Sequence, residues 1–135
     1  MPVSTPSPSP AQNRAQTDIA VIGGGPVGLA TALGMARAGL RVSVLERAPA
    51  SIWEEPRFDG REIALTHHSV RLLKEAGAWE HIPPAVICPL KEARVETGHF
   101  RHPLRFDTQG HGVDALGWLV SNHHNRRALF AAGMG

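Results

Sequence analysis

Three glycines in one short segment have the spacing of a loop that binds phosphate groups. Gly23, Gly25 and Gly28 stand in the order G-x-G-x-x-G, directly after a β-branched run at residues 18–22. In a strand–loop–helix unit the first glycine makes the tight turn, the second lets the backbone approach a pyrophosphate, and the third lets the helix pack closely. The start of the helix then presents unpaired N–H groups and a partial positive charge. The segment therefore predicts a dinucleotide-binding loop.

An acidic residue follows at the distance where such loops have the partner of a ribose. Glu46 comes 21 residues after Gly25, at the end of a second β-rich run, 41–45. Its carboxylate can accept hydrogen bonds from both ribose hydroxyls, and it argues against a 2′-phosphate because like charges would meet. Strand, loop, helix, strand and acid in register favour a bound dinucleotide over a glycine-rich turn that binds nothing or binds another nucleotide.

The elements that must position these residues form a βαβ unit. We expect parallel strands at residues 18–22 and 41–45, with a helix at 29–38 between them. Pro26 suits the first helical turn because its missing N–H costs nothing there. Gly39 suits the end of the helix because glycine adopts the left-handed cap conformation without a steric penalty.

The remaining sequence predicts shorter elements and an α/β fold in which a Rossmann-like parallel sheet precedes a β-rich region. Residues 1–16 are rich in proline and serine and are expected to be a disordered tail. The later elements are, in chain order, a loop at 48–60, a helix at 67–76 capped by Thr66, half-exposed strands at 93–97 and 104–106 joined by a turn that contains Gly98, an apolar run at 118–120 and a helix at 122–132.

Composition excludes several classes of protein. The chain has 135 residues, of which 42% are apolar, so it can bury one sizeable core. One cysteine excludes a disulfide framework and a four-cysteine zinc site. The formal charge is +2 and the basic residues are dispersed, which gives no case for binding nucleic acid. No apolar run approaches the roughly 20 residues that cross a bilayer.

Histidine, cysteine and tryptophan suggest no further site. The pairs His67-His68 and His123-His124 are expected to point to different faces of a helix, at the surface or at a cap, and no spacing typical of metal ligands occurs. Cys88 has no base nearby and is expected to be a buried or incidental thiol. The three tryptophans are scattered and are expected to pack in the core rather than form an aromatic cage. We therefore predict no metal site.

Three longer stretches show a family likeness. They are DIAVIGGGPVGLATALGMARAGLRVSVLER, FDGREIALTHHSVRLLKEAGAW and LGWLVSNHHNRRAL, within residues 17–132. They resemble the FAD-dependent aromatic monooxygenases (class A flavoprotein monooxygenases), and among these the ubiquinone-biosynthesis hydroxylases that act on polyprenylated phenols. The pair Glu46-Arg47 is typical of the FAD enzymes in this group, and the segment from Phe58 to Leu65 points to the ubiquinone branch.

The resemblance implies FAD as the cofactor and NAD(P)H as the reductant. The residues that it implies for FAD are Gly23, Gly25 and Gly28 at the pyrophosphate, Glu46 at the adenosine ribose, Arg47 at the adenosine end, and Arg61 and Arg126 from later segments, with Arg127 as the competing assignment. A guanidinium suits a diphosphate because it can donate two hydrogen bonds in parallel. No catalytic acid or base can be named, since the cofactor supplies the O₂ chemistry in such enzymes.

The resemblance also implies a longer enzyme, so we expect residues 17–135 to be the N-terminal part of an FAD-binding domain with only the start of a substrate region. The expected function is hydroxylation of a polyprenylated phenol in ubiquinone biosynthesis. Hydroxylation of a soluble aromatic, NAD-dependent dehydrogenation and an inactive nucleotide-binding remnant are the alternatives. The expected location is the cytoplasm, and association with the inner membrane or with a biosynthetic complex is left open.

Overall fold

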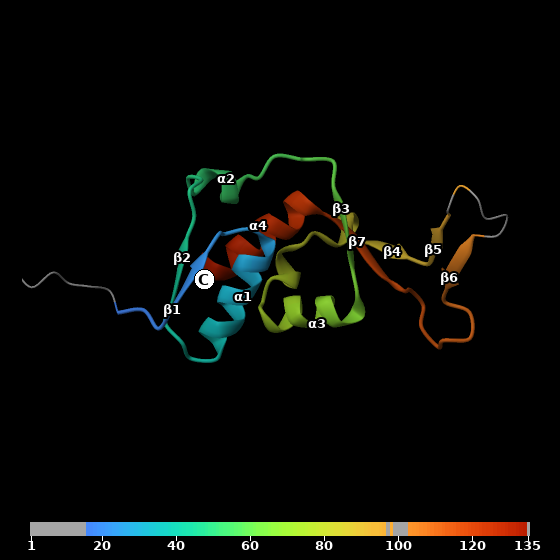
Figure 1. Cartoon of the computed structure of the whole chain (residues 1–135), viewed down its shortest axis with the longest axis horizontal. Coiled ribbons are helices and arrows are strands. Elements are labelled where there is room, and N and C mark those ends of the chain that lie inside the picture. The colour runs from blue at the N-terminus through green and yellow to red at the C-terminus, as the bar shows by residue number, and fades with distance from the viewer. Residues whose placement is uncertain (1–15, 97, 99–102, 135) are drawn as a thin grey trace, which may run out of the picture.

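The structure, a computed structural model, describes residues 16–96, 98 and 103–134. The predicted tail lies outside these residues apart from Gln16, and the predicted turn lies outside them apart from Gly98. In chain order the elements are β1 (Ile19–Ile22), α1 (Pro26–Arg37), β2 (Val42–Leu45), α2 (Ser51–Glu54), β3 (Glu62–Leu65), α3 (His67–Glu75), the 3-10 helices η1 (Trp79–His81) and η2 (Pro84–Val86), β4 (Cys88–Leu90), β5 (Glu92–Val95), β6 (Leu104–Asp107), β7 (Gly117–Ser121) and α4 (Asn122–Met134) (Figure 1).

The predicted βαβ unit is confirmed. Strands β1 and β2 are parallel, with Ile19 opposite Val42. Helix α1 begins at Pro26, earlier than predicted, because Gly25 before it is extended and already acts as the N-cap. The helix ends just before Gly39, whose φ of +88° is the left-handed conformation that glycine adopts readily.

A second, antiparallel sheet has the order β3-β7-β4. The apolar run predicted at 118–120 forms the middle of β7, and Val120 in it is fully buried. Strands β3 and β4 were not predicted, since each is short and exists only by pairing with β7. Pro89 is tolerated in β4 because that strand is at the edge of the sheet.

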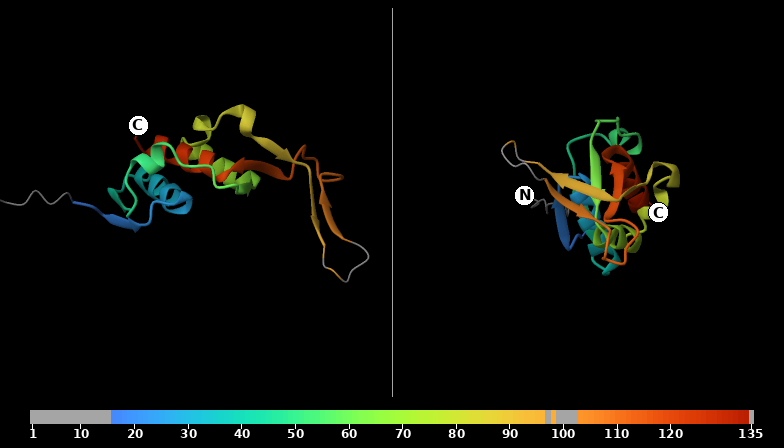
Figure 2. Two further views of the ribbon diagram at one scale, coloured as in Figure 1. Left: turned by 90° about the horizontal axis from the view of Figure 1, so that it is seen from above. Right: turned by 90° about the vertical axis from the view of Figure 1, so that its right-hand side faces the viewer.

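Two further predictions concern the regions before and after this sheet. The expected loop at 48–60 contains the four-residue helix α2, which buries Trp53, so the loop prediction was wrong there. The predicted strands at 93–97 and 104–106 are confirmed as the antiparallel hairpin β5–β6, although β5 is shifted to Glu92–Val95. The hairpin projects away from the helices (Figure 2).

The core is built around α4, which lies between α1 and the β3–β7 pair in Figure 1. Leu129 packs with Leu73 and Ala78, and its neighbour Ala128 packs with Ile82 and Val120. Apolar residues of α1 cover the first of these two clusters. Among the described residues, no helix combines the length and apolar character that crossing a bilayer requires.

Gly28 determines how closely α1 approaches the strand before it. A β-carbon at Gly28 would overlap the carbonyl oxygen of Gly23, and Val21 lies just beyond. The sequence motif assigns this glycine to close packing of the helix on the strand. In the structure, the atom that a β-carbon at Gly28 would meet first belongs to the backbone of the loop and not to the strand.

Gly28→Ala is therefore expected to destabilise the fold, by about 2 kcal/mol or more, because the loop backbone must move. Gly34 lies in the same helix, and no atom lies within 4 Å of the place that a β-carbon would take there. Gly34→Ala is the matched control and should raise stability by about 0.5–1 kcal/mol. Urea denaturation followed by circular dichroism measures both. Equal stability of the Gly28 variant and the wild type would contradict the proposed contact.

Candidate functional site

A large cavity among the described residues lies between the start of α1, the end of β2, and the elements β3, α3 and α4. Its volume is about 740 Å³, within the range of pockets that hold small molecules and cofactors. Four predicted site residues line it, namely Gly25, Glu46, Arg61 and Arg126. The chain thus brings together residues that are up to 101 positions apart. Gly23, Gly28 and Arg47 are not among the lining residues.

The glycine loop closes over the end of β2. The N–H of Gly23 donates to the carbonyl oxygen of Leu45 at 2.8 Å, and a φ of +96° explains a glycine there. Gly25 is different, because its φ of −65° and ψ of 175° are open to any residue. No atom lies within 4 Å of the position that a β-carbon of Gly25 would take. The space beside the Gly25 backbone is therefore open toward the cavity.

The first turn of α1 is suited to an anion. It contains no acidic residue, and no side chain caps its N–H groups. Unpaired N–H groups at a helix N-terminus and the helix dipole both favour a negatively charged ligand. Together with the open space at Gly25, this leaves the start of α1 accessible to a phosphate group.

Glu46 joins the glycine loop to the segment after β2. One carboxylate oxygen accepts from the N–H of Gly24 at 2.8 Å and the other from the N–H of Ala48 at 2.9 Å. The bonds from Ala48 and Gly24 lower the pKa of Glu46, so it is ionised at neutral pH. Each oxygen keeps a lone pair that can accept a hydroxyl of a ligand. A β-carbon at Gly24 would crowd Trp53 and Glu46, a packing role that the sequence alone did not indicate.

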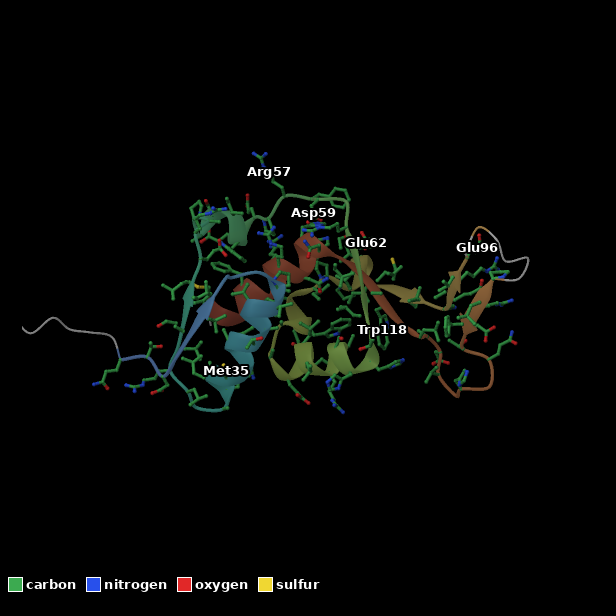
Figure 3. All side chains as sticks on the ribbon, in the orientation of Figure 1. Met35, Arg57, Asp59, Glu62, Glu96 and Trp118 are labelled. Atoms are coloured by element: carbon green, nitrogen blue, oxygen red, sulfur yellow. The ribbon has the colours of Figure 1, made fainter. Side chains whose placement is uncertain are left out.

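Arg61 is held at the junction of β3 and α4 by an ion pair. Its Nε and Nη2 donate to one oxygen of Asp59 at 2.9 and 2.6 Å. The side-chain amide of Asn122 donates to the same oxygen at 2.7 Å. Arg61 first, and Asn122 second, hold the pKa of Asp59 well below its usual range. Figure 3 shows Asp59 beside the start of α4.

Arg126 and Arg127, the two competing assignments, face different surroundings. The guanidinium of Arg126 stacks over the ring of Trp53, with 5.1 Å between Cζ and the ring centroid, and lines the large cavity. Arg127 is exposed and lines a separate pocket beside Glu54. Arg47 is exposed as well. The geometry favours Arg126 over Arg127 as the cavity residue, while the roles of all three toward a cofactor stay predictions.

Two asparagines that line the same cavity were not predicted as site residues. Asn122 and Asn125 are 5% and 4% exposed, although asparagine is usually a surface residue. With Arg126 and Leu129 they have the spacing i, i+3, i+4, i+7, which places all four on one face of α4. That spacing was readable in the sequence once Leu129 was recognised as a core residue.

The histidine predictions need one correction. The rings of His123 and His124 are 4.0 Å apart between centroids, so the expectation that they point to different faces was wrong. His67 is exposed at the start of α3, as expected, and its Nε2 lies 2.8 Å from the carbonyl oxygen of Ala115. Within the described part of the chain, no three His, Cys, Asp or Glu side chains are gathered so that they could hold a metal ion.

The thiol and the tryptophans have no role in the cavity beyond the contact at Trp53. Cys88 is exposed, so the expectation of a buried thiol was wrong and the incidental alternative remains. Trp53 is buried, as predicted. Trp79 and Trp118 are half-buried and pack edge to face against each other, with 6.4 Å between ring centroids.

Comparison with known proteins gives a family match and several relatives. The family described as FAD binding domain matches residues 16–113. The chain is 42% identical to the ubiquinone hydroxylase UbiM of Neisseria meningitidis over 118 residues, which are 84% of this chain and 26% of the relative. It is 36% identical to the 3-demethoxyubiquinol 3-hydroxylase of Escherichia coli over 120 residues, which are 86% of this chain and 30% of the relative. The chain therefore spans between a quarter and a third of the length of these curated relatives.

Two solved structures share the fold. A flavoprotein/dehydrogenase from Cytophaga hutchinsonii has a TM-score of 0.61 at 21% identity, covering 87% of this chain and 28% of that one. The p-nitrophenol 4-monooxygenase PnpA from Pseudomonas putida has a TM-score of 0.60 at 23% identity, covering 86% of this chain and 29% of that one. The α/β arrangement with a parallel strand pair is therefore shared with these two proteins.

Acid sensitivity of the fold should depend in part on Asp59. Because its pKa is lower in the folded chain, the unfolded chain takes up a proton first, so the Asp59 contribution is complete above about pH 5 and is lost as the pH falls toward the pKa of the folded chain. We expect Asp59→Asn to lower Tm at pH 7 and to flatten its decrease between about pH 5 and 3. Thermal melts across this range measure the effect. The exposed Asp114, changed to asparagine, is the control and should keep the wild-type slope; parallel curves for Asp59→Asn and wild type would contradict the assignment.

Proposed function

The chain belongs to the FAD-binding-domain family, and on that premise we propose that it binds FAD in the cavity between α1 and α4, as the FAD-binding part of an aromatic hydroxylase. The observation that carries the proposal is the glycine loop. Its one glycine without a conformational or packing reason to be glycine, Gly25, lies at the open wall of this cavity. An ionised Glu46 stands at the same wall.

The residues present fit FAD. The first turn of α1 can take the negatively charged diphosphate, and Glu46 can accept the hydroxyls of the adenosine ribose. Arg126 lines the same cavity and can offer its guanidinium to a diphosphate. Arg61 lines it as well, with its Nε and Nη2 already donating to Asp59. We assign Arg47, which is exposed beside Glu46, to the adenosine end, and Gly23 and Gly28 to the shape of the loop.

The reaction proposed is hydroxylation of a polyprenylated phenol in ubiquinone biosynthesis. Bound FAD, reduced by NAD(P)H, supplies the chemistry that transfers oxygen from O₂ to the aromatic ring. The residues of this chain bind and orient the cofactor, and the apolar side chains of the cavity exclude water from it. Two relatives are named ubiquinone hydroxylase and 3-demethoxyubiquinol 3-hydroxylase, which favours this substrate over a soluble aromatic.

The proposal extends to where the substrate is encountered. A polyprenyl chain partitions into a bilayer because its apolar surface is unfavourable in water. We therefore assign the reaction to the surface of the inner membrane, reached either directly or through a biosynthetic complex. Membership of the FAD-binding-domain family favours FAD over NAD as the bound dinucleotide.

Gly25→Val is expected to abolish FAD binding and to leave the fold intact. The valine side chain would occupy the space of the phosphate oxygens, whereas the backbone angles of Gly25 suit any residue. Flavin fluorescence titration measures binding, and circular dichroism checks the fold. Gly34→Val, the same change at an exposed position of α1, is the matched control and should bind FAD as the wild type does. Glu46→Ala should lower affinity about ten- to a hundredfold. Equal affinity of Gly25→Val and wild type would exclude this loop as the cofactor site.

The hydroxylase assignment is tested by a chimera. The segment of Neisseria meningitidis UbiM that matches this chain is replaced by residues 16–134, and the chimera is expressed in a strain that lacks its own ubiquinone hydroxylase. We expect ubiquinone to be restored, and we expect the same chimera carrying Gly25→Val to fail. A folded, FAD-loaded chimera that restores no ubiquinone would contradict the assignment of this chain to ubiquinone hydroxylation.

A further inference from the structure

Trp53 lies between the glycine loop and helix α4 and contacts both. It belongs to α2, which packs on α4, and its side chain is buried although it lines the cavity (Figure 1). At one end of the indole ring, Cη2 and Cζ2 lie 3.0 and 3.1 Å from the place that a β-carbon of Gly24 would take. Over the same ring lies the guanidinium of Arg126, at 5.1 Å from the centroid. One buried side chain therefore connects two walls of the cavity.

The guanidinium of Arg126 is held without the use of its hydrogen-bond donors. Among the described residues, no carboxylate lies within ion-pair distance of Arg126, and none of its N–H groups is hydrogen-bonded. Arg61 differs, because its Nε and Nη2 donate to Asp59. An aromatic ring attracts a cation through its face, and the N–H groups at the edge of the guanidinium stay free. Arg126 thus keeps its five donors for a ligand.

The ring also determines where Arg126 lies relative to the glycine loop. A long side chain that is free in solvent loses rotamer freedom when a ligand binds, and one that is already held loses less. Because the same ring lies against Gly24, it holds the guanidinium at a defined place relative to Gly25 and the start of α1. These are the two groups to which the diphosphate is assigned, so Trp53 sets the spacing between them.

We propose that Trp53 is a positioning residue, whose indole ring holds the guanidinium of Arg126 in place for the diphosphate of FAD. The inference rests on the proposed function. Trp53 acts through Arg126 and needs no contact of its own with the cofactor. The same role explains the glycine at position 24, because a side chain there would displace the ring on which Arg126 lies.

A double-mutant cycle tests whether Trp53 acts through Arg126. Flavin fluorescence titration gives the affinity for FAD of the wild type, Trp53→Leu, Arg126→Met and the double variant, and circular dichroism checks each fold. We expect Arg126→Met to lower affinity about ten- to a hundredfold and Trp53→Leu about three- to tenfold. The double variant should match Arg126→Met within about twofold, because the ring then has no guanidinium to hold. A ring that only packs the core would cause the same loss in both backgrounds, and that result would overturn the inference.

Further variants separate the ring from its volume. Trp53→Phe keeps an aromatic face and should recover most of the affinity lost in Trp53→Leu, and equal losses in the two would overturn the inference. If Trp53→Leu does not fold, the cycle is run with Trp53→Met, which fills more of the space. Trp79→Leu removes a ring beside Lys74, and Arg127→Met removes a guanidinium; both lie outside the cavity and should bind FAD as the wild type does. A wild-type chain that binds no FAD would overturn the proposed function, whereas one that binds FAD with additive losses would overturn this inference alone.

Discussion

The close contact between Gly28 and the carbonyl of Gly23 is the constraint on which the N-terminal part of the site depends. It brings the first turn of α1 against the end of β1, so the loop between them must be short and must turn sharply at Gly23. The loop is then held on its other side by the carboxylate of Glu46, through Gly24. The position of the start of α1 at the wall of the cavity follows from this one backbone contact, and the Glu46 carboxylate supplies the negative charge there.

Helix α4 has the corresponding role on the opposite wall. Its apolar residues, Ala128 and Leu129, join two clusters of the core, and the same helix presents Asn122, Asn125 and Arg126 to the cavity. A helix that is fixed by burial holds its polar side chains in a defined place, because rotating it would expose the core. The rigidity of this wall therefore comes from hydrophobic packing rather than from the polar residues themselves.

The βαβ unit, α3 and α4 could be predicted from the local sequence alone, because the residue types that favour each of these elements are close together in the chain. Strands β3 and β4 were not predictable in this way, since they are defined by pairing with β7, up to 59 positions distant in sequence between paired residues. Helix α2 is a single turn and was too short for its period to be seen. At the site, the spacing of the sequence motif predicted the three glycines of the loop and Glu46. It did not predict Asn122 and Asn125, because the sequence alone does not distinguish a buried asparagine from one at the surface.

The glycines of the loop differ in why they are glycine, and this has an evolutionary consequence. Gly23 and Gly28 are required by the fold, through a positive φ and through a backbone contact, whether or not a ligand binds. Gly25 has ordinary backbone angles and free space around it, so folding alone places no restriction on it. A lineage that had ceased to bind nucleotide would accumulate larger residues at position 25 while keeping the other two. The fold therefore explains a glycine at positions 23 and 28, and only a bound ligand would explain one at position 25.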